Sequence, residues 1–160
     1  MIYDFTFHNP TTIYFGKTAL DNLQKELAKY GKNVLLMYGK NAVKKIGLYD
    51  KVLAILQSAG KNVVEMSGIK PNPSYRQVLE GAKLVRDNDV DLILAVGGGS
   101  TIDCAKAVSV SAYCDGDPWE KYWIKKEEVT GKIVPVGAIL TMAGTASEMN
   151  GGSVITNEEK

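Results

Sequence analysis

Residues 92–101 read LILAVGGGST, so five consecutive apolar residues run directly into three glycines, a serine and a threonine. A short continuous apolar run is typical of a strand that is buried on both faces of a sheet. Residues 101–112 are rich in alanine and valine, which predicts a helix directly after the glycines. The stretch therefore predicts a buried strand, a glycine turn and a helix in immediate succession.

The same alternation extends in both directions along the chain. The further predicted strands lie at 34–38, 63–66, 133–136 and, as a short final strand, 153–156. The further predicted helices lie at 18–31, 49–60 and 74–89, with a short helix beginning near Asp117. Because strands alternate with helices and the connections are short, we expect an α/β fold with a Rossmann-like, doubly wound, mostly parallel sheet covered on both faces.

The N-terminal residues follow a different pattern. Residues 3–8 alternate apolar and polar side chains, which predicts a strand, and residues 9–12 have the composition of a turn. The apolar residues 13–15 then predict a returning strand. We therefore expect a β-hairpin over residues 2–15, ahead of the main fold.

Two hydroxyl side chains precede predicted helices. Thr18, with Asp21 three residues later, resembles a capping box, and Ser74 follows a stiff proline-containing turn. A side-chain oxygen at this position accepts a hydrogen bond from an N–H group of the first helical turn. We expect both residues to cap their helices, and Gly31 to end the first of these helices.

The composition sets limits on the function. The chain has 160 residues, 19 basic and 18 acidic side chains and a net charge of +1, and 45% of its residues are hydrophobic. These values are ordinary for one globular domain, taken as residues 1–160, and give no basic surface for nucleic acid. No apolar run is long enough to span a membrane, and no secretory signal is evident. We expect a cytoplasmic protein without nucleic-acid or membrane partners.

The residues that usually bind metals are scarce. His8 is the single histidine, and the two cysteines, Cys104 and Cys114, form neither a C-x-x-C pair nor a disulfide framework. Zinc and non-haem iron sites usually take three or more ligands from histidine, cysteine and carboxylate. We therefore expect neither a metal site nor a Ser-His-Asp relay in this chain, and we assign no catalytic residue to it.

The glycine turn has the features of an anion-binding site. Glycines permit positive φ and let an anion approach the backbone, because no Cβ stands in the way. The first N–H groups of the following helix lack partners, and the helix dipole adds positive charge there. Ser100 and Thr101 can cap the helix or bind a phosphate oxygen, and Asp103 or Lys106 can contact a ligand. The alternative is a tight turn without a ligand, since the motif is neither G-x-G-x-x-G nor a P-loop.

Two other loops are expected at the same edge of the sheet. Residues 141–148 follow the fourth strand and carry hydroxyls that can donate to phosphate, ribose or a carboxamide, although a plain polar loop would look the same. Gly39, Lys40 and Asn41 follow the first buried strand, where NAD-binding folds place an acidic residue on the ribose. A lysine in this loop, without a neighbouring carboxylate, favours NADP over NAD. The alternative is that Lys40, Lys44 and Lys45 form a solvated face.

Four stretches together resemble the iron-containing (group III) alcohol dehydrogenase family, and most closely its butanol dehydrogenase-like branch. These stretches are FHNPTTIYFG at 7–16, KPNPSY at 70–75, VGGGSTIDCAK at 96–106 and LTMAGTASEMNGGSVITNEEK at 140–160. The resemblance implies a dehydroquinate synthase-like N-terminal domain that binds NAD(P), followed by a helical domain with Asp and His ligands for Fe²⁺ or Zn²⁺. The chain ends where the first domain of the family ends, so the metal-binding domain is expected to be absent from it.

The resemblance also implies a set of cofactor-binding residues. By this resemblance the set is Gly39, Lys40, Asn41, Gly97, Gly98, Gly99, Ser100, Asp103, Thr141, Met142, Ser147 and Lys160. The glycines and Ser100 would hold the pyrophosphate, and Asp103 would lie near the nicotinamide. The family often has two threonines where this chain has Thr141 and Met142, so one hydroxyl contact is lost. The hairpin over 2–15 would contribute to a homodimer.

The expected function follows from the resemblance. The chain is expected to be the cofactor-binding domain of an alcohol dehydrogenase that transfers a hydride between a primary alcohol or aldehyde and NADP(H), with NAD as the alternative. This piece alone is expected to be inactive. The other candidates are a glycerol dehydrogenase domain, a dehydroquinate synthase-like domain, and a stand-alone nucleotide-binding sensor.

Overall fold

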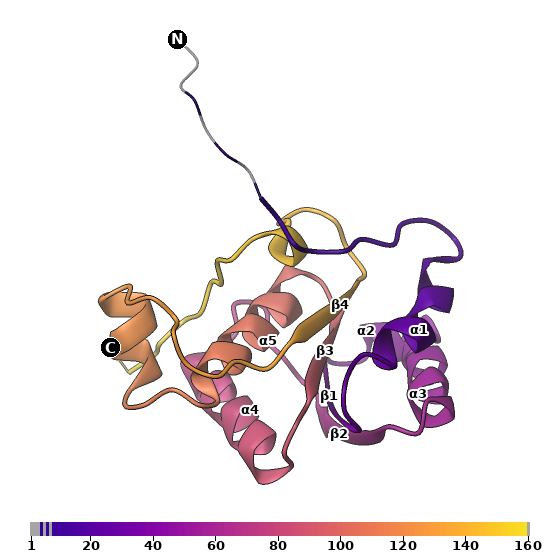
Figure 1. Cartoon of the computed structure of the whole chain (residues 1–160), viewed down its shortest axis with the longest axis horizontal. Helices are drawn as coiled ribbons and strands as arrows, with labels where there is room; N and C mark the ends of the chain where they lie inside the picture. Colours follow the sequence, from indigo (N-terminus) through magenta and orange to yellow (C-terminus); the bar gives the residue numbers. More distant parts are fainter. Residues whose placement is uncertain (1–3, 5, 7, 160) are drawn as a thin grey trace.

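A computed structural model of the chain describes residues 4, 6 and 8–159 (Figure 1). Four strands form one parallel sheet in the order β2-β1-β3-β4. The strands are β1 (Asn33–Tyr38), β2 (Asn62–Met66), β3 (Leu92–Gly97) and β4 (Val136–Leu140). The expected α/β fold with a parallel sheet is confirmed.

The two central strands are buried almost completely. Leu35 of β1 lies opposite Val64 of β2 and Ile93 of β3, so β1 is paired along both of its edges. All six residues of β3 are buried, and so are five of the six in β1. Burial on both faces is the reason that these segments are continuous apolar runs rather than alternating ones.

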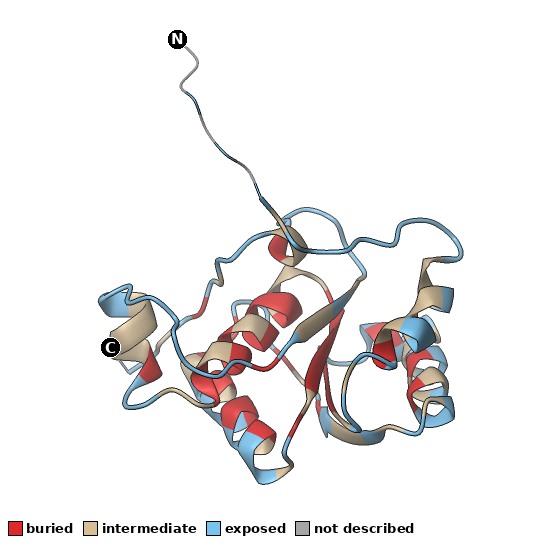
Figure 2. Ribbon diagram, in the orientation of Figure 1, coloured by how far each residue is buried: buried red, intermediate tan, exposed pale blue. Residues whose placement is uncertain are grey.

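Helices cover both faces of the sheet (Figures 1 and 2). The helices are α1 (Leu23–Leu27), α2 (Ala42–Lys45), α3 (Leu48–Ser58), α4 (Tyr75–Asp87) and α5 (Gly99–Ser111). Leu36 and Leu94 belong to the core shared with α1, α2 and α3, whereas Met37 and Ala95 belong to the core shared with α4 and α5. Successive strand residues thus point to opposite layers, as a doubly wound sheet requires.

Helices α4 and α5 approach each other closely. A Cβ atom on Gly81 of α4 would lie 2.5 Å from Cγ2 of Val108 of α5. Ser74 caps α4, because its Oγ accepts a hydrogen bond from the Gln77 N–H group at 3.4 Å, as the sequence predicts. No helix in the described part of the chain is both long and apolar enough to cross a membrane.

The strands near the C-terminus differ from the prediction. The fourth strand begins at Val136 rather than at Ile133, because Pro135 has no N–H group to donate and contributes only its carbonyl, which accepts from the Ile93 N–H group at 2.9 Å. The segment predicted as a final strand forms only an isolated parallel bridge between Ser74 and Thr156. That bridge still ties the end of the chain to the start of α4.

The structure of the N-terminal segment differs from the predictions made for it. Residues 13–15 are assigned to no strand and are exposed, so the expected returning strand of the hairpin is absent from this structure. The other predicted strand includes Tyr3, Phe5 and Phe7, which lie outside the described residues. The side chain of Thr18 forms no capping hydrogen bond, and a 3₁₀ turn, η1 (Ala19–Asn22), leads into α1 instead.

The end of the first helical segment also differs from the prediction. Helix α1 ends at Leu27, well before Gly31. Gly31 has no positive φ, and a Cβ atom there would collide with the carboxylate of Asp91. This position is therefore distinguished by the close approach of Asp91 and not by a helix cap, and a side chain here would require Asp91 to move. Two short elements complete the fold, the π-helix η2 (Trp119–Ile124) near the helix start predicted at Asp117, and the 3₁₀ turn η3 (Ser147–Met149).

Candidate functional site

A pocket of about 480 Å³ lies at the carboxyl edge of the sheet. It is lined by Lys40, Ile69, Pro71, Gly98, Gly99, Ser100, Thr101 and Met142. These residues come from the connections that follow all four strands. The chain leaves β1 and β3 toward opposite faces of the sheet, so the pocket includes the switch point at which doubly wound folds bind ligands.

The glycine turn forms the floor of the pocket. Gly98 is the residue before α5 and has an extended backbone with φ −90° and ψ −168°. Its carbonyl accepts hydrogen bonds from the N–H groups of Thr101 at 3.1 Å and Ile102 at 3.2 Å. Gly99 and Ser100 occupy the first turn of α5, where N–H groups have no acceptor within the helix. Helix dipole and free donors together make this end of α5 suitable for an anion.

Space requires two of the three glycines, and handedness requires none of them. Contrary to the argument from positive φ, none of Gly97, Gly98 and Gly99 has a positive φ. A Cβ atom on Gly97 would lie 2.5 Å from Oγ1 of Thr101, and one on Gly99 would collide with Oγ1 of Thr145. A Cβ atom on Gly98 would meet nothing closer than Cβ of Met142 at 3.9 Å. Gly98 is thus the glycine whose missing side chain leaves room for a ligand.

The loop after β4 meets the glycine turn, as predicted. The N–H group of Thr141 donates to the carbonyl of Gly97 at 3.0 Å and continues the pairing of β3 with β4. Met142 lines the pocket and is 72% exposed. Ser147 is buried, with its Oγ 2.8 Å from Oγ1 of Thr145, and does not line the pocket.

The loop after β1 brings a positive charge to the pocket. Lys40 is the only charged residue among those that line it. The carbonyls of Tyr38 and Gly39 accept hydrogen bonds from Ile69 at 3.2 Å and Gly68 at 3.0 Å, which fixes the loop after β2 beside the loop after β1. Asn41 is exposed, precedes α2 without a side-chain capping bond, and does not line the pocket.

Glu65 lies in β2, the strand next to β1, and its carboxylate accepts hydrogen bonds from two tyrosines. The hydroxyl of Tyr38 donates to Oε2 of Glu65 at 2.6 Å, and that of Tyr49 donates to Oε1 at 3.0 Å. Loss of solvent and then these bonds to the carboxylate raise the pKa of Tyr38 to about 12, and the same causes raise the pKa of Tyr49 to about 12. Both hydroxyls therefore stay protonated at neutral pH and continue to donate hydrogen bonds to the Glu65 carboxylate.

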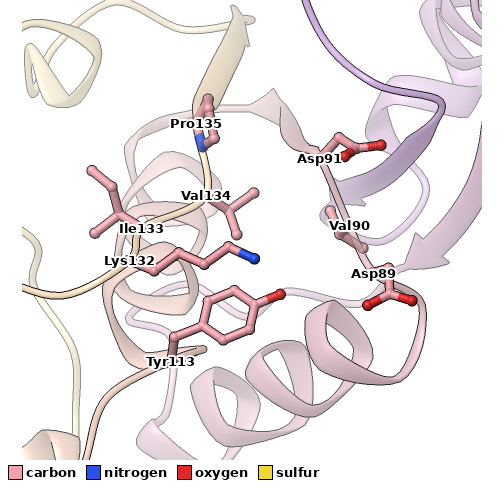
Figure 3. A pocket seen from close by; sticks show the side chains of 8 residues that line it. All are labelled: Asp89, Val90, Asp91, Tyr113, Lys132, Ile133, Val134 and Pro135. Carbon is pink, nitrogen blue, oxygen red and sulfur yellow. The ribbon is translucent and has the colours of Figure 1, made fainter.

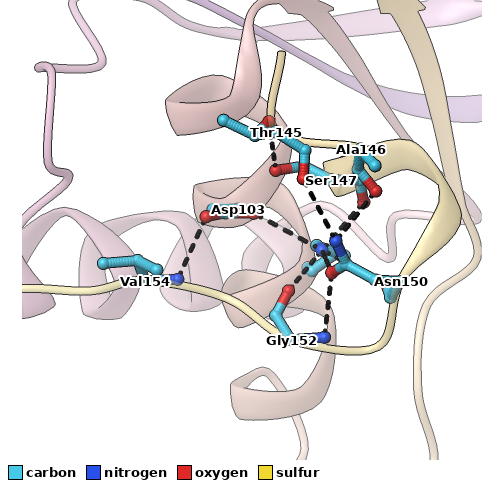
Figure 4. A network of polar contacts seen from close by, with 8 residues as sticks. Asp103, Thr145, Ala146, Ser147, Asn150, Gly152 and Val154 are labelled. Atoms are coloured by element: carbon cyan, nitrogen blue, oxygen red, sulfur yellow. Dashed lines mark hydrogen bonds and ion pairs between the residues drawn. The ribbon is translucent and has the colours of Figure 1, made fainter.

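Asp103 does not line the pocket, and its side chain takes part in a network of polar contacts (Figure 4). Its Oδ2 accepts a hydrogen bond from the N–H group of Val154 at 3.0 Å, and its Oδ1 lies 3.4 Å from Nζ of Lys106. The Lys106 ammonium in turn donates to main-chain and side-chain oxygens of residues 147–152. Both charged side chains therefore face the protein and connect α5 to the segment after β4.

The structure thus sorts the predicted residues into three groups. The residues that line the pocket are Lys40, Gly98, Gly99, Ser100 and Met142. The residues that lie beside the pocket in the same loops are Gly39, Gly97 and Thr141. The residues that do not reach the pocket are Asn41, Asp103 and Ser147. Lys160 lies outside the described residues. The predicted set omitted Thr101, which belongs to the glycine turn itself, and Ile69 and Pro71 of the loop after β2. Their position after a parallel strand was the available signal, since every such connection reaches the same edge.

A second pocket of about 240 Å³ lies at the opposite edge, before β3 and β4 (Figure 3). It is lined by Asp89, Val90, Asp91, Tyr113, Lys132, Ile133, Val134 and Pro135. Nζ of Lys132 lies 4.1 Å from the centre of the Tyr113 ring, and Asp91 accepts the N–H group of Asn33 at 2.9 Å. Since ligands of doubly wound folds bind at the carboxyl edge, the first pocket is the candidate site.

The described residues contain no cluster of the side chains that usually bind metals. Among residues 4, 6 and 8–159, no three side chains of histidine, cysteine, aspartate or glutamate are grouped so that they could hold one. Cys104 is buried inside α5, and burial raises the pKa of its thiol to about 12. The candidate site is therefore a binding site built from main-chain donors, one lysine and an apolar wall.

Known proteins are similar to nearly the whole of this chain. The family model for iron-containing alcohol dehydrogenase matches residues 10–160. The probable NADH-dependent butanol dehydrogenase 2 of Bacillus subtilis is 49% identical over 98% of this chain and 40% of its own length. The NADPH-dependent aldehyde reductase of Escherichia coli is 40% identical over 97% of this chain and 40% of its own length.

Solved structures give the same result. The crystal structure of NADH-dependent butanol dehydrogenase A from Thermotoga maritima has a TM-score of 0.90 and 41% identity over 98% of this chain and 39% of that chain. This chain therefore spans about 40% of the length of the curated relatives it matches. With the family model, the sequence identities and the fold in agreement, the chain belongs to the iron-containing alcohol dehydrogenase family.

Proposed function

We propose that the chain is the dinucleotide-binding domain of a metal-dependent alcohol dehydrogenase, and that it binds NADP(H) at the carboxyl edge of its sheet. The observation that carries the proposal is the uncovered glycine turn at the start of α5, which shares one pocket with Lys40. The resident cofactor fits this chain, because the space above Gly98 is open and would be filled by a Cβ atom on that residue.

Each part of the pocket has a role in binding. The N–H groups of Gly99 and Ser100 would hold the pyrophosphate, with the positive end of the α5 dipole beneath it. Lys40 would contact the phosphate on the adenosine ribose. Thr141 and Met142 would lie along the nicotinamide half, where Met142 supplies an apolar surface and Thr141 a hydroxyl.

The preference for NADP over NAD rests on the loop after β1. A 2′-phosphate needs a positive charge and no free carboxylate, because like charges repel in a partly buried site. Lys40 lines the pocket, Gly39 carries no side chain, and Glu65 is held by two tyrosine hydroxyls. The relatives include both NADH- and NADPH-dependent proteins, so the choice depends on these local residues.

The bound cofactor would supply or accept the hydride that a primary alcohol or aldehyde exchanges. The residues of this chain would bind and orient it. Fe²⁺ or Zn²⁺ would be held by a helical domain beyond this chain. The chain by itself would therefore bind cofactor without catalysing the reaction. A cytoplasmic location and a homodimer formed through residues 2–15 belong to the same proposal.

The test is a calorimetric titration of the chain with NADPH and with NADH, together with Gly98→Ala. The new methyl group has room in the protein, so the unfolding midpoint should stay unchanged, but it would occupy the space in which the pyrophosphate approaches the backbone. We expect NADPH to bind the unmodified chain and to bind Gly98→Ala at least about tenfold more weakly.

Gly144→Ala is the matched control, since a Cβ atom there has no neighbour within 4 Å and this residue does not line the pocket. Its NADPH affinity should equal that of the unmodified chain. Equal affinity of Gly98→Ala and the unmodified chain would contradict the placement of the pyrophosphate, and no binding of either dinucleotide would contradict the proposed function.

A further inference from the structure

Lys106 of α5 forms four hydrogen bonds with the segment after β4. Its Nζ donates to the carbonyl of Ser147 at 2.8 Å, to the carbonyl of Asn150 at 3.2 Å and to Oδ1 of Asn150 at 3.0 Å, and it also contacts the carbonyl of Gly152. An ammonium has three protons, so these oxygens share all of its donors. One side chain of α5 thus gathers the turn over residues 147–152.

The charge of Lys106 is balanced within the same helix. Asp103 lies one turn earlier, with Oδ1 at 3.4 Å from Nζ, and the two side chains are only 12% and 18% exposed. Oδ2 of Asp103 accepts the N–H group of Val154, so α5 holds the chain on both sides of Gly152. Oδ1 of Asp103 has no hydrogen-bond partner apart from this ion pair, which makes the lysine its main compensation.

The turn held by Lys106 continues to the glycine turn. Nδ2 of Asn150 donates to the carbonyls of Ala146 at 2.8 Å and Thr145 at 3.4 Å (Figure 4). Ala146 has a φ of 50°, a left-handed conformation that a residue other than glycine keeps only when its surroundings enforce it. Thr145 stands directly against Gly99, at the floor of the pocket.

We infer that Lys106 is a positioning residue for cofactor binding, which acts through Asn150 to hold Thr145 against the glycine turn. The inference rests on the proposed function, because the contact would set the shape of the pocket at its pyrophosphate side. Lys106 itself does not line the pocket. The adenosine side, formed by Lys40, Ile69 and Pro71, belongs to other loops and does not depend on this turn.

The experiment compares two ligands on Lys106→Met and Asn150→Ala. NADPH reports on the whole pocket, and adenosine 2′-monophosphate reports on the adenosine side alone. We expect the dissociation constant of NADPH to rise on the order of tenfold in both variants, as the loss of one charge-assisted bond would produce. That of adenosine 2′-monophosphate should change less than about twofold. A general loss of structure would weaken both ligands together.

Lys83→Met is the matched control, because Lys83 also forms an ion pair along a helix, with Asp87, but on the exposed surface of α4. Both of its affinities should remain unchanged. Asn150 lies in an exposed loop, so Asn150→Ala decides the question if Lys106→Met does not fold. Unchanged NADPH binding in Asn150→Ala, or equal weakening of both ligands, would overturn the inference. Failure of the unmodified chain to bind NADPH would instead contradict the proposed function.

Discussion

At the scale of single residues, neighbouring glycines have different tasks. Gly97 and Gly99 are fixed by the protein itself, through Thr101 and Thr145, whereas Gly98 faces open space. The sequence indicates that the three together form the floor of an anion site only because they follow a buried strand. It does not separate them, since the separation depends on Thr145, a residue more than forty positions away in the chain. The same holds for Asp103, whose partner at Val154 is equally distant in sequence.

Gly39 provides a test of cofactor choice. A Cβ atom there would lie 3.7 Å from the carbonyl of Ile69, an ordinary contact, so Gly39→Asp should fold normally. We expect the added carboxylate to repel a 2′-phosphate beside Lys40 and to accept a hydrogen bond from an unmodified ribose. The dissociation constant of NADPH should rise by roughly tenfold and that of NADH should fall, as measured by calorimetry.

Gly39→Asn is the control for this prediction, because it adds a side chain of the same size without the charge. It should shift the preference much less than Gly39→Asp does. If Gly39→Asp weakened NADPH and NADH by the same factor, the loop after β1 would not be the part of the site that reads the adenosine ribose.

The tyrosines on Glu65 predict a dependence of stability on alkaline pH. Tyr49 has a pKa raised to about 12 in the folded chain, against 10.0 for an ordinary tyrosine. Between these values the unfolded chain loses the proton while the folded chain keeps it, so the free energy of unfolding falls as the pH rises. We expect this fall to be smaller in Tyr49→Phe, measured by urea unfolding at several values from about pH 9 upward. Tyr30→Phe, outside the cluster, should keep the slope of the unmodified chain.

At the scale of elements, prediction from sequence succeeds where burial dominates. Strands β1 and β3 are buried on both faces, so their apolar runs are unambiguous, and α4 and α5 follow clear starting signals. β4 is displaced because a proline can contribute only its carbonyl at the strand start. The segment over residues 13–15 has strand-like composition, but a strand also needs a partner, and composition cannot supply one.

Ser74 and Thr18 allow one rule to be tested twice. Ser74 accepts a hydrogen bond from the N–H group of Gln77, whereas Thr18 forms no such bond at the start of η1. Ser74→Ala should therefore lower the free energy of unfolding by about 1 kcal/mol. Thr18→Ala should change the free energy of unfolding very little. Chemical unfolding of the two variants measures both free energies. Equal losses in the two variants would mean that something other than capping determines the cost.

At the scale of the whole molecule, the sheet brings together a site that no single element could form alone. Each of the four connections at the carboxyl edge contributes at least one residue to the pocket, and the switch between β1 and β3 places Lys40 near the glycine turn. Parallel topology makes this convergence predictable from sequence. The volume of the pocket and the residues of its apolar wall, Ile69 and Pro71, are not predictable in this way, because they depend on how far each loop folds back over the sheet edge.

The length of the chain predicts what the isolated protein does. It spans about 40% of the length of its curated relatives, and among its described residues no three histidine, cysteine, aspartate or glutamate side chains are grouped to hold a metal ion. We expect the purified chain to bind NADPH but not to oxidise it with butanal, with or without added Fe²⁺ or Zn²⁺, as followed by nicotinamide absorbance. NADPH oxidation that depended on butanal, above that of the Gly98→Ala variant, would refute this prediction.

The burial of α5 determines how fast its amide protons exchange with solvent. Nine of its thirteen residues are buried, including Ile102, Ala105 and Val108, so the amide protons beyond its first turn can reach solvent only when much of the domain opens. The free donors of Gly99 and Ser100 are thus fixed to one of the slowest-exchanging parts of the chain. When NADPH binds, deuterium uptake should fall at these first-turn amides and in the segment after β4, and it should change little in the rest of α5.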